Sequence, residues 1–142
     1  MTHTIDTSDI AALITEEVSR VAAAAYSEDG TSLYDSTNIL SRDAATVSRL
    51  IWDSVDAIVH RTSDICTLIP TPLALSFYAP DMDPSKESAV KDEIDRAISL
   101  GACAAWFKEK APARAEEYLT RANTALDVAV GLLKTRKAPS RI

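Results

Sequence analysis

The chain has 142 residues, of which 46% are hydrophobic, 25% charged and 6% aromatic. This length suits one domain with a sizeable core of its own. Three glycines, six prolines and two cysteines exclude the collagen-like, low-complexity and disulfide-rich classes of protein. A net charge of −6 argues against a protein that coats nucleic acid, and no sequence-specific nucleic-acid binding is expected.

The charge is unevenly distributed along the chain. From Lys108 to the end there are 8 basic and 4 acidic residues, whereas the first 107 residues carry 7 basic and 17 acidic ones. The final basic residues are Lys134, Arg136, Lys137 and Arg141. They fit a flexible solvated tail over 137–142 that complements a helix C-terminus, or a tail that docks on an acidic partner or a phosphate.

The 23 alanines and the scarcity of glycine predict a mostly all-α fold. The first helix is expected at about 8–26, where Ile10, Ile14 and Val18 recur every four residues. Gly30 suits a left-handed turn after this helix, and 31–40 reads as a polar connection.

A second helix is expected at about 42–62. Ser41 is a good N-terminal cap, and the apolar residues that share one face are Val47, Ile51, Val55 and Ile58.

The stretch of about 65–80 cannot be one helix, because Pro70, Pro72 and Pro80 interrupt it. Leu73, Leu75 and Phe77 alternate with smaller or more polar residues, which predicts a strand within a small hairpin. Since a lone strand leaves backbone groups unpaired, it needs a partner strand from this chain or from a neighbouring subunit.

Two further helices are expected at about 84–109 and 112–135. Asp83-Pro84 is a specific helix start, and a glycine at 101, inside the helix, costs roughly 1 kcal/mol unless another backbone approaches closely. A short break joins the two helices, so they should form an antiparallel hairpin. The second one carries a heptad seam of Ala115, Leu119, Ala122, Leu126, Ala129 and Leu133. Together these patterns predict a four-helix bundle-like domain over 1–136 with one short extended segment.

Catalytic motifs are scarce. His60 has Asp56 and Asp64 one turn away on either side, which fits a general base or, more simply, a surface histidine paired with a neighbour. His3 lies near a terminus that is expected to be disordered. The acidic residues between 81 and 95 lack the EF-hand pattern, and no phosphate-binding loop or nucleophile motif is present. No enzyme activity, cofactor or metal is therefore expected.

The two cysteines, Cys66 and Cys103, lack metal-ligand spacing. Cys103 fits a small buried hydrophobic residue, and pairing of the two remains open. With no secretion signal at 1–9 and no apolar run of about 20 residues, a cytoplasmic protein that does not span a membrane is expected.

Aromatic and apolar side chains supply the candidate contact surface. Trp52 and Trp106 fit either the core or an interface, since aromatic residues often dominate the energy of protein contacts. The residues expected to contact another chain are Leu73, Leu75, Phe77, Tyr78, Trp106, Phe107 and Tyr118.

The stretch 97–107 reads AISLGACAAWF, and a second helix follows it after a short break. Over 89–139 this pattern resembles small helical phage neck proteins, the head–tail connector or adaptor family. In that family a long apolar helix ends in an aromatic pair, and a basic end follows. Here the pair is Trp106-Phe107, and the extended segment after Ile65 would be a protruding element for subunit contacts.

The resemblance implies a structural protein of a phage or prophage that forms a ring between portal and tail, in the host cytoplasm and in the virion. Its partners would be other copies of itself and the portal or tail proteins. Such rings surround a DNA channel, and an acidic wall would let DNA slide. The family offers no catalytic residues. The alternative is a soluble intracellular helical module or regulator that holds a partner helix along the 115–133 seam.

Overall fold

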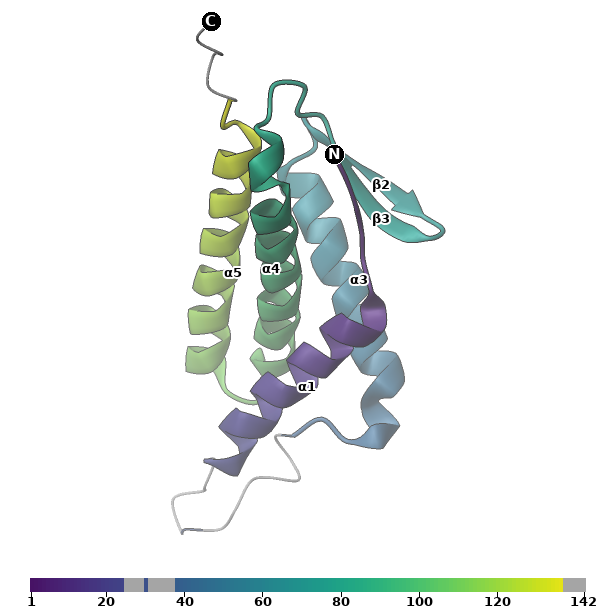
Figure 1. Cartoon of the computed structure of the whole chain (residues 1–142). Helices are drawn as coiled ribbons and strands as arrows, with labels where there is room; N and C mark the ends of the chain where they lie inside the picture. The colour runs from purple at the N-terminus through teal and green to yellow at the C-terminus, as the bar shows by residue number, and fades with distance from the viewer. Residues whose placement is uncertain (25–29, 31–37, 137–142) are drawn as a thin grey trace, which may run out of the picture.

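The computed structural model describes residues 1–24, 30 and 38–136. Within them the chain forms the long helices α1 (Thr7–Ala23), α3 (Ala44–Arg61), α4 (Glu87–Phe107) and α5 (Pro112–Leu133). A small sheet of β1 (Thr2–Thr4), β2 (Cys66–Pro70) and β3 (Leu73–Phe77) lies beside them (Figure 1). The mostly helical prediction is confirmed, but the antiparallel three-stranded sheet makes the fold more than a bundle.

The helix α4 is the centre of the molecule. In the view of Figure 1, α5 and α3 flank α4 and α1 crosses the lower part, and near its C-terminal end α3 also reaches α5 through Arg61. Buried side chains therefore occur almost all around α4, among them Val90, Ile94, Ile98, Leu100, Cys103 and Phe107. They belong to one continuous core that also takes in α1, α3, α5 and β3.

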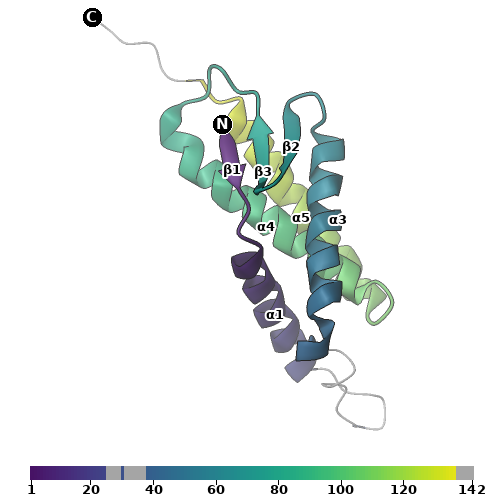
Figure 2. The ribbon, with the colours of Figure 1, turned by 90° about the vertical axis from the view of Figure 1, so that its right-hand side faces the viewer.

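The strand predicted within 65–80 is β3, and its partners come from this chain. The sheet has the order β1-β3-β2 (Figure 2). Thr2 is paired with Ser76, and Leu68 with Leu75. The prediction of a disordered start was wrong: Phe77 N donates to Met1 O at 2.7 Å, and Ile5 N donates to Leu73 O at 2.8 Å. β3 thus receives a neighbour on both edges.

Helix starts follow the capping rules. Asp6 caps α1 by accepting hydrogen bonds from Ser8 N and Asp9 N at 3.0 and 3.1 Å. Asp83 accepts a bond from Ser85 N at 3.0 Å ahead of α4, as the Asp83-Pro84 pair predicts. Gly30 has φ of +84°, the left-handed turn expected of it.

The predicted helices form with slightly different ends. Ser41 starts a 3-10 turn (Ser41–Asp43) before α3, and a second such turn (Pro84–Lys86) precedes α4. Ala25 and Tyr26 of the first predicted helix, the connection 31–37 and the tail 137–142 with Lys137 and Arg141 lie outside the described residues.

Four of the six residues predicted for the heptad seam of α5, Ala122, Leu126, Ala129 and Leu133, are buried as expected, but Leu119 is not. Tyr118 is buried, whereas Leu119 is 52% exposed. The buried stripe of α5 is Tyr118, Ala122, Ala125, Leu126, Ala129 and Leu133. An aromatic ring thus occupies the position that the sequence pattern gave to leucine.

Gly101 does have a close neighbour, as its place inside a helix predicts. The neighbour is a side chain and not a backbone: a Cβ on Gly101 would lie 2.6 Å from Ser54 Oγ of α3. Ser54 Oγ donates a hydrogen bond to Ile98 O of α4 at 2.9 Å. None of the described helices is both long enough and apolar enough to cross a membrane.

Candidate interaction surface

Most of the side chains predicted to contact another chain lie inside this one. Leu73, Leu75, Phe77, Phe107 and Tyr118 are all buried in the core. They were expected at the surface for two reasons: apolar residues alternate along the strand, and aromatic residues often lie in protein contacts. Both patterns indicate an apolar face, but neither shows whether the same chain or another chain covers it. Of the predicted set, Tyr78 is 75% exposed and Trp106 is half-buried.

The buried aromatic pair positions the α4–α5 hairpin. The rings of Phe107 and Tyr118 are stacked with their centroids 5.6 Å apart. The Tyr118 hydroxyl then donates a hydrogen bond of 2.6 Å to Glu17 of α1. One tyrosine therefore connects the first and last helices of the chain.

Glu17 is the most strongly perturbed carboxylate of the described residues. Burial by itself would raise its pKa, but the hydrogen bond from Tyr118 and the charges of Arg20 and Arg121 hold the pKa below its ordinary value. Arg20 also bonds to the Glu17 carboxylate directly, and the Arg121 guanidinium lies 5.4 Å from the centre of the Tyr118 ring. The carboxylate is thus ionised and fully engaged within the chain.

A polar hollow of about 420 Å³ lies next to this contact. It is lined by Leu13, Glu17, Asp92, Asp95, Arg96, Ser99, Leu100, Cys103 and Arg121. His3, which the sequence pattern had set aside, reaches its edge: His3 Nε2 lies 2.6 Å from Asp95 Oδ1. The His3 side chain is buried, and its contact with Asp95 joins β1 to α4.

The chemistry of this hollow does not supply an activated nucleophile. Burial, with a smaller contribution from Glu17, raises the pKa of the Cys103 thiol to about 12. Burial and the hydrogen bond to Glu17 also raise the pKa of Tyr118. Both groups therefore keep their protons at neutral pH.

The structure does not place His60, the candidate general base, in a pocket. His60, Asp56 and Asp64 are all exposed, and His60 lines none of the hollows found among the described residues. Among the same residues, no group of three or more histidine, cysteine or acidic side chains stands close enough to hold a metal ion. Cys66 and Cys103 are both free and buried.

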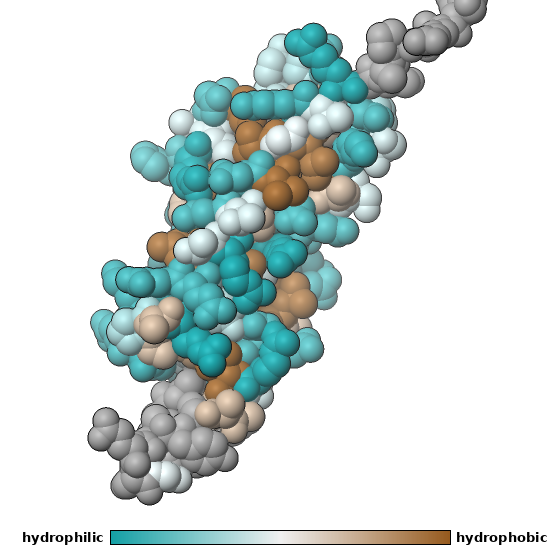
Figure 3. All heavy atoms as spheres, turned by 90° about the vertical axis from the view of Figure 1, so that its left-hand side faces the viewer, coloured by the Kyte–Doolittle hydropathy of each residue, from teal (hydrophilic) through white to brown (hydrophobic). Residues whose placement is uncertain are grey.

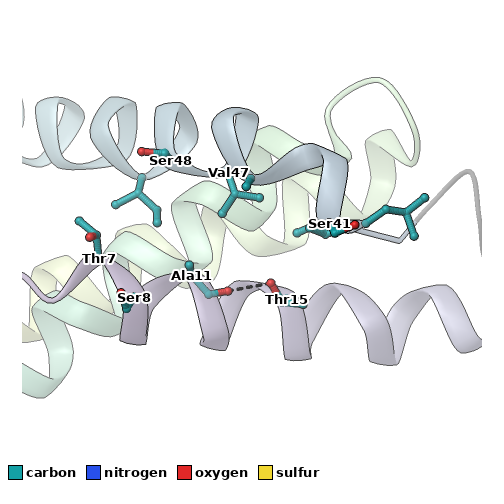
Figure 4. Close-up of a pocket in the computed structure, with 11 residues that line it drawn as sticks. Thr7, Ser8, Ala11, Thr15, Ser41, Val47 and Ser48 are labelled. Carbon is teal, nitrogen blue, oxygen red and sulfur yellow. Dashed lines mark hydrogen bonds between the residues drawn. The ribbon is translucent and has the colours of Figure 1, made fainter.

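A second hollow, of about 400 Å³, lies between α1 and α3 (Figure 4). Its lining is uncharged, with Ala11, Val47 and Ile51 among the apolar residues and Thr7, Ser8, Thr15, Ser41 and Ser48 as hydroxyl groups. Thr15 Oγ1 donates to Ala11 O of its own helix at 2.8 Å. A lining of this kind offers little to orient a charged ligand.

A third hollow, of about 400 Å³, is the α4–α5 groove, lined by Gly101, Ala104, Ala105, Lys108, Pro112, Ala115, Glu116 and Leu119. Its floor is made of glycine and alanine, and the exposed Leu119 forms one wall. Small residues of this kind allow another helix to approach closely.

The outer side of α5 carries exposed charged side chains, such as Glu117 and Arg121, as well as the exposed Val128. Val128 is 45% exposed there, and the Thr120 and Thr124 hydroxyls donate to carbonyl groups of the same helix at 3.0 Å. Figure 3 shows this side of the molecule, with apolar patches between polar atoms. Because the threonine donors are used within the helix, their methyl groups are free for apolar contact.

The basic end of α5 is fixed as far as Arg136. Asp83 N donates to Thr135 O at 2.9 Å, and Met82 and Arg136 form an antiparallel bridge. Lys134 and Arg136 are both exposed. At the other end of α5, Lys110 Nζ lies 4.8 Å from the centre of the Trp106 ring.

The chain was compared with protein-family models, curated proteins and solved structures, and none of them matches. The function is therefore inferred from the structure itself, in which the α4–α5 groove and the outer side of α5 are open to contact with another chain.

Proposed function

We propose that this protein is a structural assembly protein that associates with copies of itself, in the manner of a ring-forming head–tail connector of a phage or prophage. The observation that carries the proposal is the position of α5. This helix packs extensively against α4 and presents its outer side, with Val128, to solvent. The resemblance of 89–139 to phage neck proteins adds the specific setting between portal and tail.

The arrangement of the helices favours a head-to-tail contact. α5 and α3 present different surfaces of the molecule to solvent (Figure 1), although the C-terminal end of α3 contacts α5 through Arg61. A contact between the α5 side of one copy and the α3 side of the next joins two different surfaces. Such a heterologous contact repeats from copy to copy and closes into a ring when the rotation allows it.

The charge of the chain is compatible with a ring around DNA. The first 107 residues carry 17 acidic and 7 basic residues. A negatively charged channel wall repels phosphate, so DNA passes without binding. The exposed basic residues at the end of α5, Lys134 and Arg136, are available for an acidic surface of a portal or tail protein.

The mass of the particles in solution tests this proposal. The full chain should form closed oligomers, seen as discrete masses by light scattering and as rings by electron microscopy. Val128→Glu should reduce them, because it places a charge in the apolar contact. Leu13→Glu is the matched control, since Leu13 is 47% exposed on α1 and Val128 is 45% exposed on α5. A chain that stays monomeric at the highest concentration reached, or a Val128→Glu variant that assembles normally, would contradict the proposal.

A helical protein-binding module is the second candidate. The α4–α5 groove favours it, because a floor of small residues accepts an amphipathic helix. Co-purification of one stable partner of a different sequence, together with a monomeric chain, would support this candidate against the first.

A further inference from the structure

We propose that the α4–α5 groove is a two-fold contact between two copies of this chain, in which Leu119 of each copy enters the groove of the other. This contact is separate from the head-to-tail contact proposed above, because it uses the opposite edge of α5 from Val128. Either contact can therefore exist without the other.

The α4–α5 groove has a different lining from the region where α3 contacts α5. Near the C-terminal end of α3, the Arg61 guanidinium bonds to Asn123 and lies 3.6 Å from Asp127 Oδ1 of α5. Towards the α4–α5 turn, Gly101, Ala104 and Ala105 of α4 form an open floor. The hollow of about 400 Å³ above this floor has room for a leucine side chain.

The side chain that fits the groove is Leu119, which lies at the edge of the same groove. Leu119 is 52% exposed and belongs to the wall that α5 contributes. When a projecting side chain lies beside a hollow that it fits, a two-fold rotation places each projection in the other copy's hollow. The alanine and glycine floor allows the two hairpins to approach to ordinary helix-packing distances of about 8–10 Å.

The charges on the rim favour a second copy over an unrelated apolar helix. Lys108 and Glu116 line opposite walls of the groove, and neither forms an ion pair with another described residue. The two-fold rotation brings Lys108 of one copy to Glu116 of the other, and the same pair forms a second time. An uncharged occupant would offer neither of these exposed charges an opposite charge.

The test measures dimer dissociation by sedimentation equilibrium in the Val128→Glu background, so that ring formation does not contribute. The Val128→Glu chain should be in monomer–dimer equilibrium. Leu119→Glu should abolish the dimer, and Leu13→Glu, at a similarly exposed leucine on α1, should leave it unchanged. Circular dichroism confirms that each variant is folded.

Charge exchange provides a second, independent readout on exposed side chains. Lys108→Glu and Glu116→Lys should each weaken the dimer about tenfold, because each places two like charges opposite each other. The double variant should restore the dissociation constant to within about threefold of the parent, since both pairs form again with their signs exchanged.

Three outcomes would overturn the proposal. They are a Val128→Glu chain that is monomeric at all concentrations, a Leu119→Glu variant that still dimerises, and a double charge exchange that fails to restore the dimer. Rings formed by a Leu119→Glu chain with native Val128 would leave the head-to-tail contact intact, so the two proposals can fail separately.

Discussion

The Tyr118 hydroxyl donates a hydrogen bond of 2.6 Å to Glu17, a residue 101 positions earlier in the sequence. The ring of the same tyrosine is stacked on Phe107 and is covered on another side by the Arg121 guanidinium. Removal of the hydroxyl group alone therefore measures the contribution of the hydrogen bond to stability, because the packing of the ring is kept.

Tyr118→Phe should lower the free energy of unfolding by about 1.5–3 kcal/mol, the usual loss for a hydrogen bond to a charged group. The half-buried carboxylate of Glu17 would keep Arg20 as its partner, so the lower end of that range is expected. Urea unfolding measures the change. Tyr78→Phe is the control, because Tyr78 is 75% exposed and its loss of a hydroxyl should leave the stability unchanged.

The same contact predicts an acid-dependent loss of stability. The pKa of Glu17 is lower in the folded chain than its ordinary value of 4.5, so the unfolded chain binds more protons at that pH. Glu17 thus stabilises the fold above about pH 4.5, and this contribution is lost as the pH falls through the folded pKa. Glu17→Gln should show a smaller decline in unfolding free energy than the parent chain between pH 5 and pH 3, on the scale of an ordinary carboxyl titration. An equal decline of the unfolding free energy with pH in the parent chain and in Glu17→Gln would contradict the prediction.

The close contact between Gly101 and Ser54 predicts that substitutions at these two positions change the free energy of unfolding non-additively. Gly101→Ala should be neutral or destabilising, because the new Cβ would meet Ser54 Oγ at 2.6 Å and displace it from Ile98 O. In a Ser54→Ala background the same change should stabilise by about 1 kcal/mol, the helix preference of alanine over glycine. The atom that then remains nearest is Ser54 Cβ at 3.6 Å, an ordinary contact.

Gly131→Ala is the matched control for that cycle. A Cβ on Gly131 of α5 would have no neighbour within 4 Å, so it should stabilise by about 1 kcal/mol in either background. Additive behaviour of Gly101→Ala and Ser54→Ala in thermal unfolding would show that the predicted close contact is absent.

Both cysteine thiols should be unreactive in the native chain. Burial raises the pKa of Cys66 as well as that of Cys103, and only the thiolate reacts rapidly with alkylating agents. Mass spectrometry after iodoacetamide treatment should find neither residue modified in buffer and both modified in urea. Rapid modification of the native chain would contradict the buried positions.

The contact between His3 and Asp95 is expected to stabilise the pairing of β1 with β3. His3→Ala removes the contact to Asp95 and should speed amide exchange at Ile5 and Phe77, whose N–H groups bond across β1 and β3. We expect a global loss of about 1 kcal/mol or less, because Asp95 is partly exposed. His60→Ala is the control at an exposed histidine, and it should leave these amides unchanged.

The helices and the extended segment could be predicted from the sequence, because spacings such as Ile10, Ile14 and Val18 or Leu73, Leu75 and Phe77 report the backbone period directly. The strand β1 was missed, since three residues of Thr-His-Thr carry too little apolar pattern. The alternation of β-branched residues before the Asp6 cap is the signal that could have found it.

The contact residues were harder to predict, because apolar periodicity identifies a covered face and not what covers it. Leu75 and Phe107 have the pattern of either a core or an interface, and only the positions of α1, α3 and α5 around α4 decide for the core. Leu119 was placed in the seam because it lies four residues after Ala115 and three before Ala122, but Tyr118 fits the same spacing in the reverse order, and the one-residue difference is a rotation of about 100° around the helix.

The pairing of β1 with β3 has a consequence for the order of folding. Residues 1 and 77 exchange hydrogen bonds although they are 76 positions apart, whereas α4 and α5 meet across a turn of four residues, 108–111. Local contacts form faster than distant ones, so the helical hairpin should assemble early. β1, which is synthesised before β2 and β3, is then among the last elements to pair, and a newly made chain has an uncovered β3 edge until β1 pairs with it.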